Sequence, residues 1–219
     1  EYLKANTFFI DPIKTEDITL FGFSAGAIGA LYHVTTVADT FKWAAKKSVI
    51  SDAPGLHFGP KFWHRFPESY VQDATDALAN LKHPVDRDSG LLSPLIPKLC
   101  RQFPSWNFGI LQATHDFVMS TIFGEIDVED HAKLLMSPYG VPALTQDPGD
   151  NCAAFGEVDG GSHTFLVMNE TSEIRIGGVS AMEFARNIAQ GRIGKNHFAA
   201  RDAVPATGQQ LLMAFLPLR

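Results

Sequence analysis

The sequence predicts an α/β domain built on a mostly parallel β-sheet. Short apolar runs rich in β-branched residues recur along the 219 residues, and segments with helical periodicity lie between them. Such alternation is typical of strands that run parallel and are connected by helices. Hydrophobic residues make up 45% of the chain, enough for a packed core, and no repeat or low-complexity tract is visible. We expect one domain over residues 1–219.

Four strands and five helices are expected. The strands lie at 17–23, 47–55, 108–113 and 152–158, the second ending in an Asp-Ala-Pro-Gly turn. The helices lie at 1–9, 25–40, 68–82, 128–136 and 180–190. The last helix carries a capping box, with Ser180 as the cap and Glu183 three residues later, and Gly191 closes it. Residues 84–105 are apolar and interrupted by prolines, which predicts a cap or cleft wall within a segment of about 56–106.

Charge and hydropathy argue against two classes of partner. The chain has 18 basic and 24 acidic residues, a net charge of -6, and no basic stripe, so nucleic acid is not expected as a partner. Residues 18–38 carry no charged side chain but are interrupted by glycine, threonine and histidine, so a buried strand followed by a helix fits better than stable membrane insertion. The two cysteines, Cys100 and Cys152, form either one bridge or two buried thiols.

A glycine-flanked serine stands between the first strand and the helix that follows it. Gly22-Phe23-Ser24-Ala25-Gly26 has the form G-x-S-x-G, and the strand–turn–helix context makes it a predicted nucleophile elbow. Side chains at Gly22 and Gly26 are expected to collide with the neighbouring strand and helix. The turn exposes the Ser24 hydroxyl and directs the Ala25 backbone N–H to the place where an oxyanion forms.

A nucleophilic serine needs a histidine base and an acid that orients it, in the chain order serine, acid, histidine. His163 follows the last predicted strand in a Gly-Gly-Ser loop and is the predicted base, with His197 a weaker choice. Asp116 follows the third strand and is the predicted acid. Asp52, at the end of the second strand, is the second-choice acid, and its alternative role is to form a turn.

Other chemistries have weaker support. The pair His115-Asp116 occurs in metal phosphohydrolases, but no further ligands stand at a matching spacing. No C-x-x-C, H-E-x-x-H or phosphate-binding glycine loop is present, so no metal site and no cofactor are expected.

Five segments in this order resemble the pectin acetylesterase-like hydrolases, a group that includes secreted bacterial members and the animal Notum-type carboxylesterases. These segments are ITLFGFSAGAIGALYH, SVISDAPGLHF, ILQATHDFVMSTIFG, DGGSHTFL and GGVSAMEFARNIAQG, and the resemblance covers roughly residues 15–190. The resemblance implies an α/β-hydrolase fold, removal of acyl groups from oxygen, often acetyl from polysaccharide, and an extracellular or periplasmic location. It matches Ser24 to the nucleophile, Asp116 to the acid and His163 to the base. Asp52 matches an aspartate with a structural or cleft role.

The family pattern includes strands and a glycine-rich oxyanion loop upstream of the elbow, and only 23 residues precede Ser24 here. We therefore expect a preceding N-terminal segment of the same protein to complete the sheet and the oxyanion hole. The substrate class expected first is an acetylated polysaccharide. A lipase- or polyester-hydrolase-like esterase of the same fold is the runner-up, and a non-catalytic carbohydrate- or lipid-binding relative is the alternative from another class.

Overall fold

A computed structural model describes residues 11–79, 81, 85–146 and 150–202. The helix expected at 1–9 lies outside these ranges, as do residues 80 and 82 of the helix expected at 68–82.

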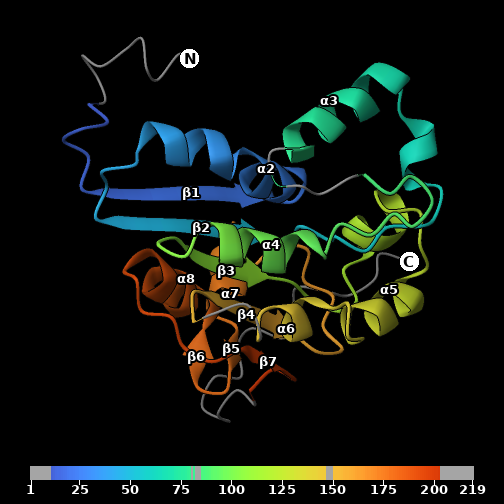
Figure 1. The fold of residues 1–219 in the computed structure, drawn as a ribbon. Helices are drawn as coiled ribbons and strands as arrows, with labels where there is room; N and C mark the ends of the chain where they lie inside the picture. Colours follow the sequence, from blue (N-terminus) through green and yellow to red (C-terminus); the bar gives the residue numbers. More distant parts are fainter. Residues whose placement is uncertain (1–10, 80, 82–84, 147–149, 203–219) are drawn as a thin grey trace.

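Five parallel strands form the central sheet, in the order β1-β2-β3-β4-β7. The strands are β1 (Asp17–Phe23), β2 (Lys46–Asp52), β3 (Asn107–Leu111), β4 (Cys152–Glu157) and β7 (His197–Ala199). Figure 1 shows β1 at the upper edge of the sheet and β7 at the lower edge. The predicted α/β class with a mostly parallel sheet is therefore confirmed, and four of the five strands match predicted segments to within a few residues.

Helices cover both faces of this sheet. On one face α2 (Ala25–Thr40) packs against β1 and β2, and on the other face α8 (Ala181–Ala189) packs against β2 and β3. The alternation of side chains along β2 explains the two layers, because Val49 belongs to the first core and Ile50 to the second.

The remaining helices and the hairpin lie in the connections between these elements. They are η1 (Phe62–Arg65), α3 (Glu68–Ala79), α4 (Leu95–Gln102), η2 (Val118–Ile122), α5 (Val128–Leu135), α6 (Val141–Leu144), α7 (Asn169–Ser172) and the two-stranded hairpin of β5 (Arg175–Ile176) and β6 (Val179–Ser180).

The predicted helix boundaries at α8 are confirmed in detail. The Ser180 side chain accepts a hydrogen bond from the Glu183 backbone N–H at 3.1 Å, and Gly191 takes a φ of 74° just after the helix. The Asp127 side chain caps α5 in the same way, by accepting from the Glu129 N–H at 2.9 Å.

The proline-interrupted segment contains a helix that the sequence did not predict. In α4 the side chains of Leu95, Ile96 and Leu99 are fully buried in the core on the α2 side of the sheet. Pro97 lies in the first turn of this helix, where its missing N–H removes no intrahelical hydrogen bond. The role of this segment as a cap or cleft wall stays a prediction.

Cys100 and Cys152 form a disulfide that joins α4 to β4, with their Cα atoms 6.2 Å apart. Between the alternatives that the sequence left open, the structure therefore contains the bridge. Within the described ranges, no helix combines the length and apolar character that crossing a membrane requires.

The first strand is paired on one side only within the described part of the chain. Its side chains alternate, with Gly22 buried beneath α2 and with Phe21 and Phe23 on the opposite face, 47% and 49% exposed. These two rings lie beside the end of the strand where α2 begins, so an apolar and open surface adjoins the elbow.

Candidate active site

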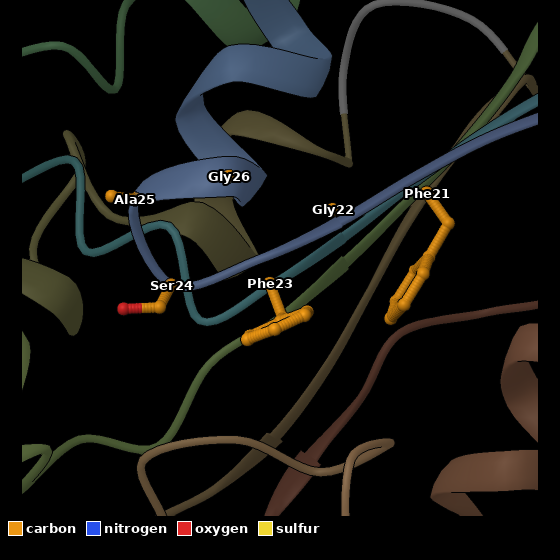
Figure 2. Close-up of a pocket in the computed structure, with 6 residues that line it drawn as sticks. All are labelled: Phe21, Gly22, Phe23, Ser24, Ala25 and Gly26. Atoms are coloured by element: carbon orange, nitrogen blue, oxygen red, sulfur yellow. The ribbon is translucent and has the colours of Figure 1, made fainter.

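The turn from β1 into α2 has the backbone of a nucleophile elbow. Ser24 lies at the turn with φ 54° and ψ -131°, a region that a non-glycine residue rarely adopts. Figure 2 shows the chain reversing at Ser24, with the rings of Phe21 and Phe23 projecting away from α2. A pocket of about 460 Å³ lies along this turn.

The two glycines of the motif have different reasons to be there. A Cβ added to Gly22 would lie 2.1 Å from the backbone oxygen of Gly26, so no larger residue fits. A Cβ added to Gly26 would meet no atom within 4 Å. The expected collision at Gly26 is therefore wrong for the described residues, because that side of the turn faces open space.

The structure brings Ser24, His163 and Asp116 into one hydrogen-bonded line. Ser24 Oγ lies 3.0 Å from His163 Nε2, and His163 Nδ1 lies 3.0 and 3.1 Å from the two carboxylate oxygens of Asp116. The three residues follow β1, β4 and β3, and the carboxyl ends of parallel strands meet at one edge of a sheet. This arrangement matches the residues and the order expected for a serine nucleophile, its base and its acid.

Asp116 is fully buried and rigidly held. Its Oδ1 accepts the backbone N–H groups of Val118 and Met119, each at 3.0 Å, at the start of η2. Its Oδ2 accepts from the side-chain amide of Gln112 at 3.2 Å. These three donors stabilise the carboxylate and leave its remaining acceptor positions to His163 Nδ1–H, which fixes the tautomer that presents a free Nε2 to Ser24.

The charge state of His163 follows from these contacts. Its hydrogen bond to Asp116 raises the pKa of His163, partial burial acts against this, and the charges of Asp116 and Asp52 act in the same direction as the hydrogen bond. A raised pKa means that the site stabilises the imidazolium, which is the form that appears when a histidine has taken the serine proton. Ser24 Oγ also lies 3.7 Å from Met119 Sδ, a much weaker acceptor than the imidazole nitrogen.

Asp52, the second-choice acid, contacts the backbone beyond His163. Its carboxylate accepts the N–H of Phe165 at 3.0 Å and of Leu166 at 2.8 Å. Burial raises the pKa of Asp52 to about 6, although both backbone hydrogen bonds lower it. The ring nitrogen Nδ1 of His163 is hydrogen-bonded to Asp116 and not to Asp52.

The predicted oxyanion donor stands at the first position of α2. Ala25 begins that helix, so its backbone N–H belongs to the first turn, where N–H groups have no partner within the helix. Such a group at a helix N-terminus attracts negative charge.

The other candidate histidines lie elsewhere. His197 belongs to β7, the edge strand on the side of the sheet opposite β1. Its Nδ1 lies 3.2 Å from the Ile176 carbonyl oxygen. His115 contacts Thr114 Oγ1 at 2.8 Å and Glu129 at 3.5 Å. Among the described residues, no three histidine, cysteine or acidic side chains are grouped as a metal would require.

Two supports of the site were missed at the sequence level. Gln112 links the turn after β2 to Asp116, because its Oε1 accepts the Gly55 N–H at 2.8 Å while its amide donates to the acid. Glu157, at the end of β4, binds Arg201 at 2.7 Å and accepts from Ser162, next to His163. Both are polar residues at the carboxyl ends of strands, and in the sequence only that position indicated that they support the site.

No protein-family model matches the chain, and a search of curated proteins finds no match either. The assignment of a chemistry to this site therefore rests on its geometry.

Proposed function

We propose that this chain is the catalytic part of a serine carboxylester hydrolase with an α/β-hydrolase fold. The observation that carries the proposal is the hydrogen-bonded line from Ser24 Oγ through His163 to Asp116, on an elbow where Ser24 has a φ of 54°. A strained backbone and a chain of three hydrogen-bonded side chains are costly features for a residue with a packing role only.

In the proposed reaction, Ser24 Oγ attacks the carbonyl carbon of an ester while its proton passes to His163 Nε2. Asp116 accepts the hydrogen bond from Nδ1–H and stabilises the imidazolium. The Ala25 N–H donates to the oxyanion, and the imidazolium then protonates the alcohol oxygen as it leaves. Water, deprotonated by the same histidine, hydrolyses the acyl-Ser24 ester and restores the hydroxyl. The reaction needs no metal or organic cofactor.

An acetyl group on a polysaccharide is the substrate that we propose, by the resemblance to the pectin acetylesterase-like hydrolases. The proposal includes an extracellular or periplasmic location, with which the Cys100–Cys152 disulfide is compatible because those compartments are oxidising.

One observation favours a second candidate, a lipase- or polyester-hydrolase-like esterase. The rings of Phe21 and Phe23 are half exposed beside Ser24 and line the pocket there, and an apolar wall suits a longer acyl chain or an aromatic ester.

We also propose that a further segment of the same protein pairs with the open edge of β1. An unpaired edge strand with exposed aromatic side chains invites pairing or aggregation, and the acyl-transfer chemistry needs a second oxyanion donor besides Ala25. Space at Gly26 is available for such a segment. Residues 1–219 alone are then expected to be poorly soluble or nearly inactive. A monomeric, stable and fully active 1–219 protein would contradict this part.

Hydrolysis of a series of esters by the intact protein tests the function. Acetylated sugars are compared with p-nitrophenyl esters of increasing acyl length, in the wild type, in Ser24→Ala and in Ser105→Ala, a control at an exposed serine. Ser24→Ala is expected to lower turnover by about 10⁴-fold to 10⁶-fold, and Ser105→Ala to leave it unchanged. Preference for acetyl supports the first substrate class, and preference for long chains the second. Activity that survives in Ser24→Ala would exclude the mechanism, and a folded wild type without activity would favour a binding protein.

A further inference from the structure

The Asp52 carboxylate accepts hydrogen bonds from the backbone of the loop that carries His163. Asp52 is fully buried at the carboxyl end of β2. Its Oδ1 and Oδ2 both lie 3.0 Å from the Phe165 nitrogen, and its Oδ2 lies 2.8 Å from the Leu166 nitrogen. These two amides follow His163 by two and three residues, so the carboxylate holds the chain at the point where it leaves the base.

The same loop is anchored in two further places. The Phe165 ring is fully buried and packs edge-on against Phe155 of β4, with ring centroids 5.4 Å apart. Before His163, the Ser162 hydroxyl donates to Glu157, which Arg201 also binds. Burial raises the pKa of Asp52 to about 6, so the charge of this anchor changes within the pH range in which esterases are assayed.

A buried carboxylate is not needed for packing at such a position. Removing an ionised group from water is costly unless hydrogen bonds or opposite charges compensate. Among the residues that the structure describes, no cationic side chain is hydrogen-bonded to Asp52. The two ionisable groups that influence it are His163, whose positive form favours the Asp52 anion, and Asp116, whose negative charge disfavours it. A neutral side chain would avoid this cost but would offer fewer acceptor positions to the two N–H groups.

We propose that Asp52 is a positioning residue for the base: its carboxylate holds the Phe165 and Leu166 amides and thereby sets His163 within reach of Ser24. This inference rests on the proposed function, because it assigns Asp52 a task in the reaction of Ser24 and His163. The Asp52 carboxylate is hydrogen-bonded to these amides, and the Ser24 N–H is held by the Asp52 backbone carbonyl, at 2.8 Å. The carboxylate therefore positions the base through the backbone, and its charge also raises the pKa of His163.

A pH dependence follows from this arrangement. Burial raises the pKa of Asp52 to about 6, so acidification replaces the anion by a neutral acid that holds the two amides less well. His163 must also lose its proton to act as a base. The active form therefore has His163 neutral and Asp52 ionised. As pH falls below about 6, the slope of log kcat/KM against pH should rise from one toward two decades per pH unit, over the roughly one to two pH units that a 10-fold to 10²-fold less active neutral form allows.

Asp52→Asn tests the proposal, with Asp127→Asn as a matched control in which an exposed carboxylate also accepts a backbone N–H. An asparagine keeps one acceptor oxygen for the Phe165 and Leu166 N–H groups, and its NH2 group takes the place of the second oxygen. We expect kcat to fall on the order of 10-fold to 10²-fold with KM little changed, because the displaced base reacts from a poorer geometry. In this variant the acid limb of the plot of log kcat/KM against pH should keep a slope of one decade per pH unit. It should move to lower pH, because the Asp52 charge no longer raises the pKa of His163. The control should retain the wild-type profile.

Amide hydrogen exchange gives a readout that needs no activity. Exchange at Phe165 and Leu166 should accelerate in Asp52→Asn, and in the wild type it should accelerate, after correction for intrinsic rates, as pH falls through about 6. The wild-type measurement decides the matter if the variant does not fold. Unchanged protection would overturn the proposal, and so would faster exchange with an unchanged kcat and acid limb. A wild type without esterase activity would refute the proposed function and, with it, the role of Asp52 in positioning a base, whereas the exchange result would still show whether Asp52 holds the loop.

Discussion

Replacing the Asp116 carboxylate by an amide is expected to invert the hydrogen bonding of His163. Asp116 Oδ1 accepts two backbone N–H groups, from Val118 and Met119, each at 3.0 Å. In Asp116→Asn the side-chain oxygen must stay at these two donors, because the opposite orientation would place the side-chain NH2 group against both backbone N–H groups. The amide nitrogen then faces Gln112 and lies at the 3.1 Å position from His163 Nδ1, while the oxygen, already bonded to two N–H groups, lies at the 3.0 Å position.

An amide that donates to Nδ1 forces the proton of a neutral His163 onto Nε2. That nitrogen then donates to Ser24 Oγ and no longer accepts the serine proton. Loss of the correct tautomer lowers kcat by about 10⁴-fold in a triad of this kind, which corresponds to roughly 5.5 kcal/mol in the activation barrier. The assay is kcat for an activated acetyl ester, with Asp130→Asn as a control at an exposed carboxylate that pairs with Lys133. A loss of less than about tenfold in Asp116→Asn, with the fold intact, would refute the role of Asp116.

The remaining predictions concern stability. Gly22→Ala should destabilise the fold by about 1–3 kcal/mol or more in denaturant unfolding, because its Cβ would lie 2.1 Å from a backbone oxygen, whereas Gly26→Ala should be neutral or stabilising. Equal effects of the two changes would contradict this. Reduction of the Cys100–Cys152 disulfide, which spans 52 residues, should lower the free energy of unfolding by about 4 kcal/mol, and an unchanged unfolding midpoint would count against it. Burial lowers the pKa of His57 to about 4, below its unfolded value of 6.5, so its contribution to stability is present above pH 6.5 and is lost on acidification toward pH 4. Between pH 7 and pH 4 this amounts to roughly 3 kcal/mol, and the difference in unfolding free energy between wild type and His57→Gln should shrink by that amount.

The sequence was most informative where local rules decide the structure. The run from Asp17 to Phe23 is apolar and contains β-branched residues, and small residues mark the turn into α2, so strand, elbow and helix were all predictable. Ser180 and Gly191 marked the ends of α8 because caps are local.

Elements that depend on tertiary contacts were not predictable in the same way. The three residues of β7 form a strand only because β4 offers them an open edge, and they show no periodicity of their own. The prolines around α4 indicated a broken segment, whereas Pro97 sits in a helical first turn. At Gly26 the expected steric reason for glycine does not hold in the described structure.

The site shows the same division. Chain order and strand ends were enough to propose Ser24, Asp116 and His163, and the structure brings these three together. The contact between Asp52 and Phe165 spans 113 residues, and the link from Gln112 to Gly55 spans 57. Such long-range support leaves no trace in residue spacing, because it depends on how loops fold over the sheet edge.

Covalent labelling shows whether Ser24 is a nucleophile that His163 activates. The intact protein is treated with a fluorophosphonate, and the modified peptide is identified by mass spectrometry in the wild type, in Ser24→Ala and in His163→Ala. We expect one label on Ser24, none in Ser24→Ala, and labelling in His163→Ala that is slower by orders of magnitude. Absence of label in a folded wild-type protein, or a label on another serine that persists in Ser24→Ala, would contradict this role of Ser24.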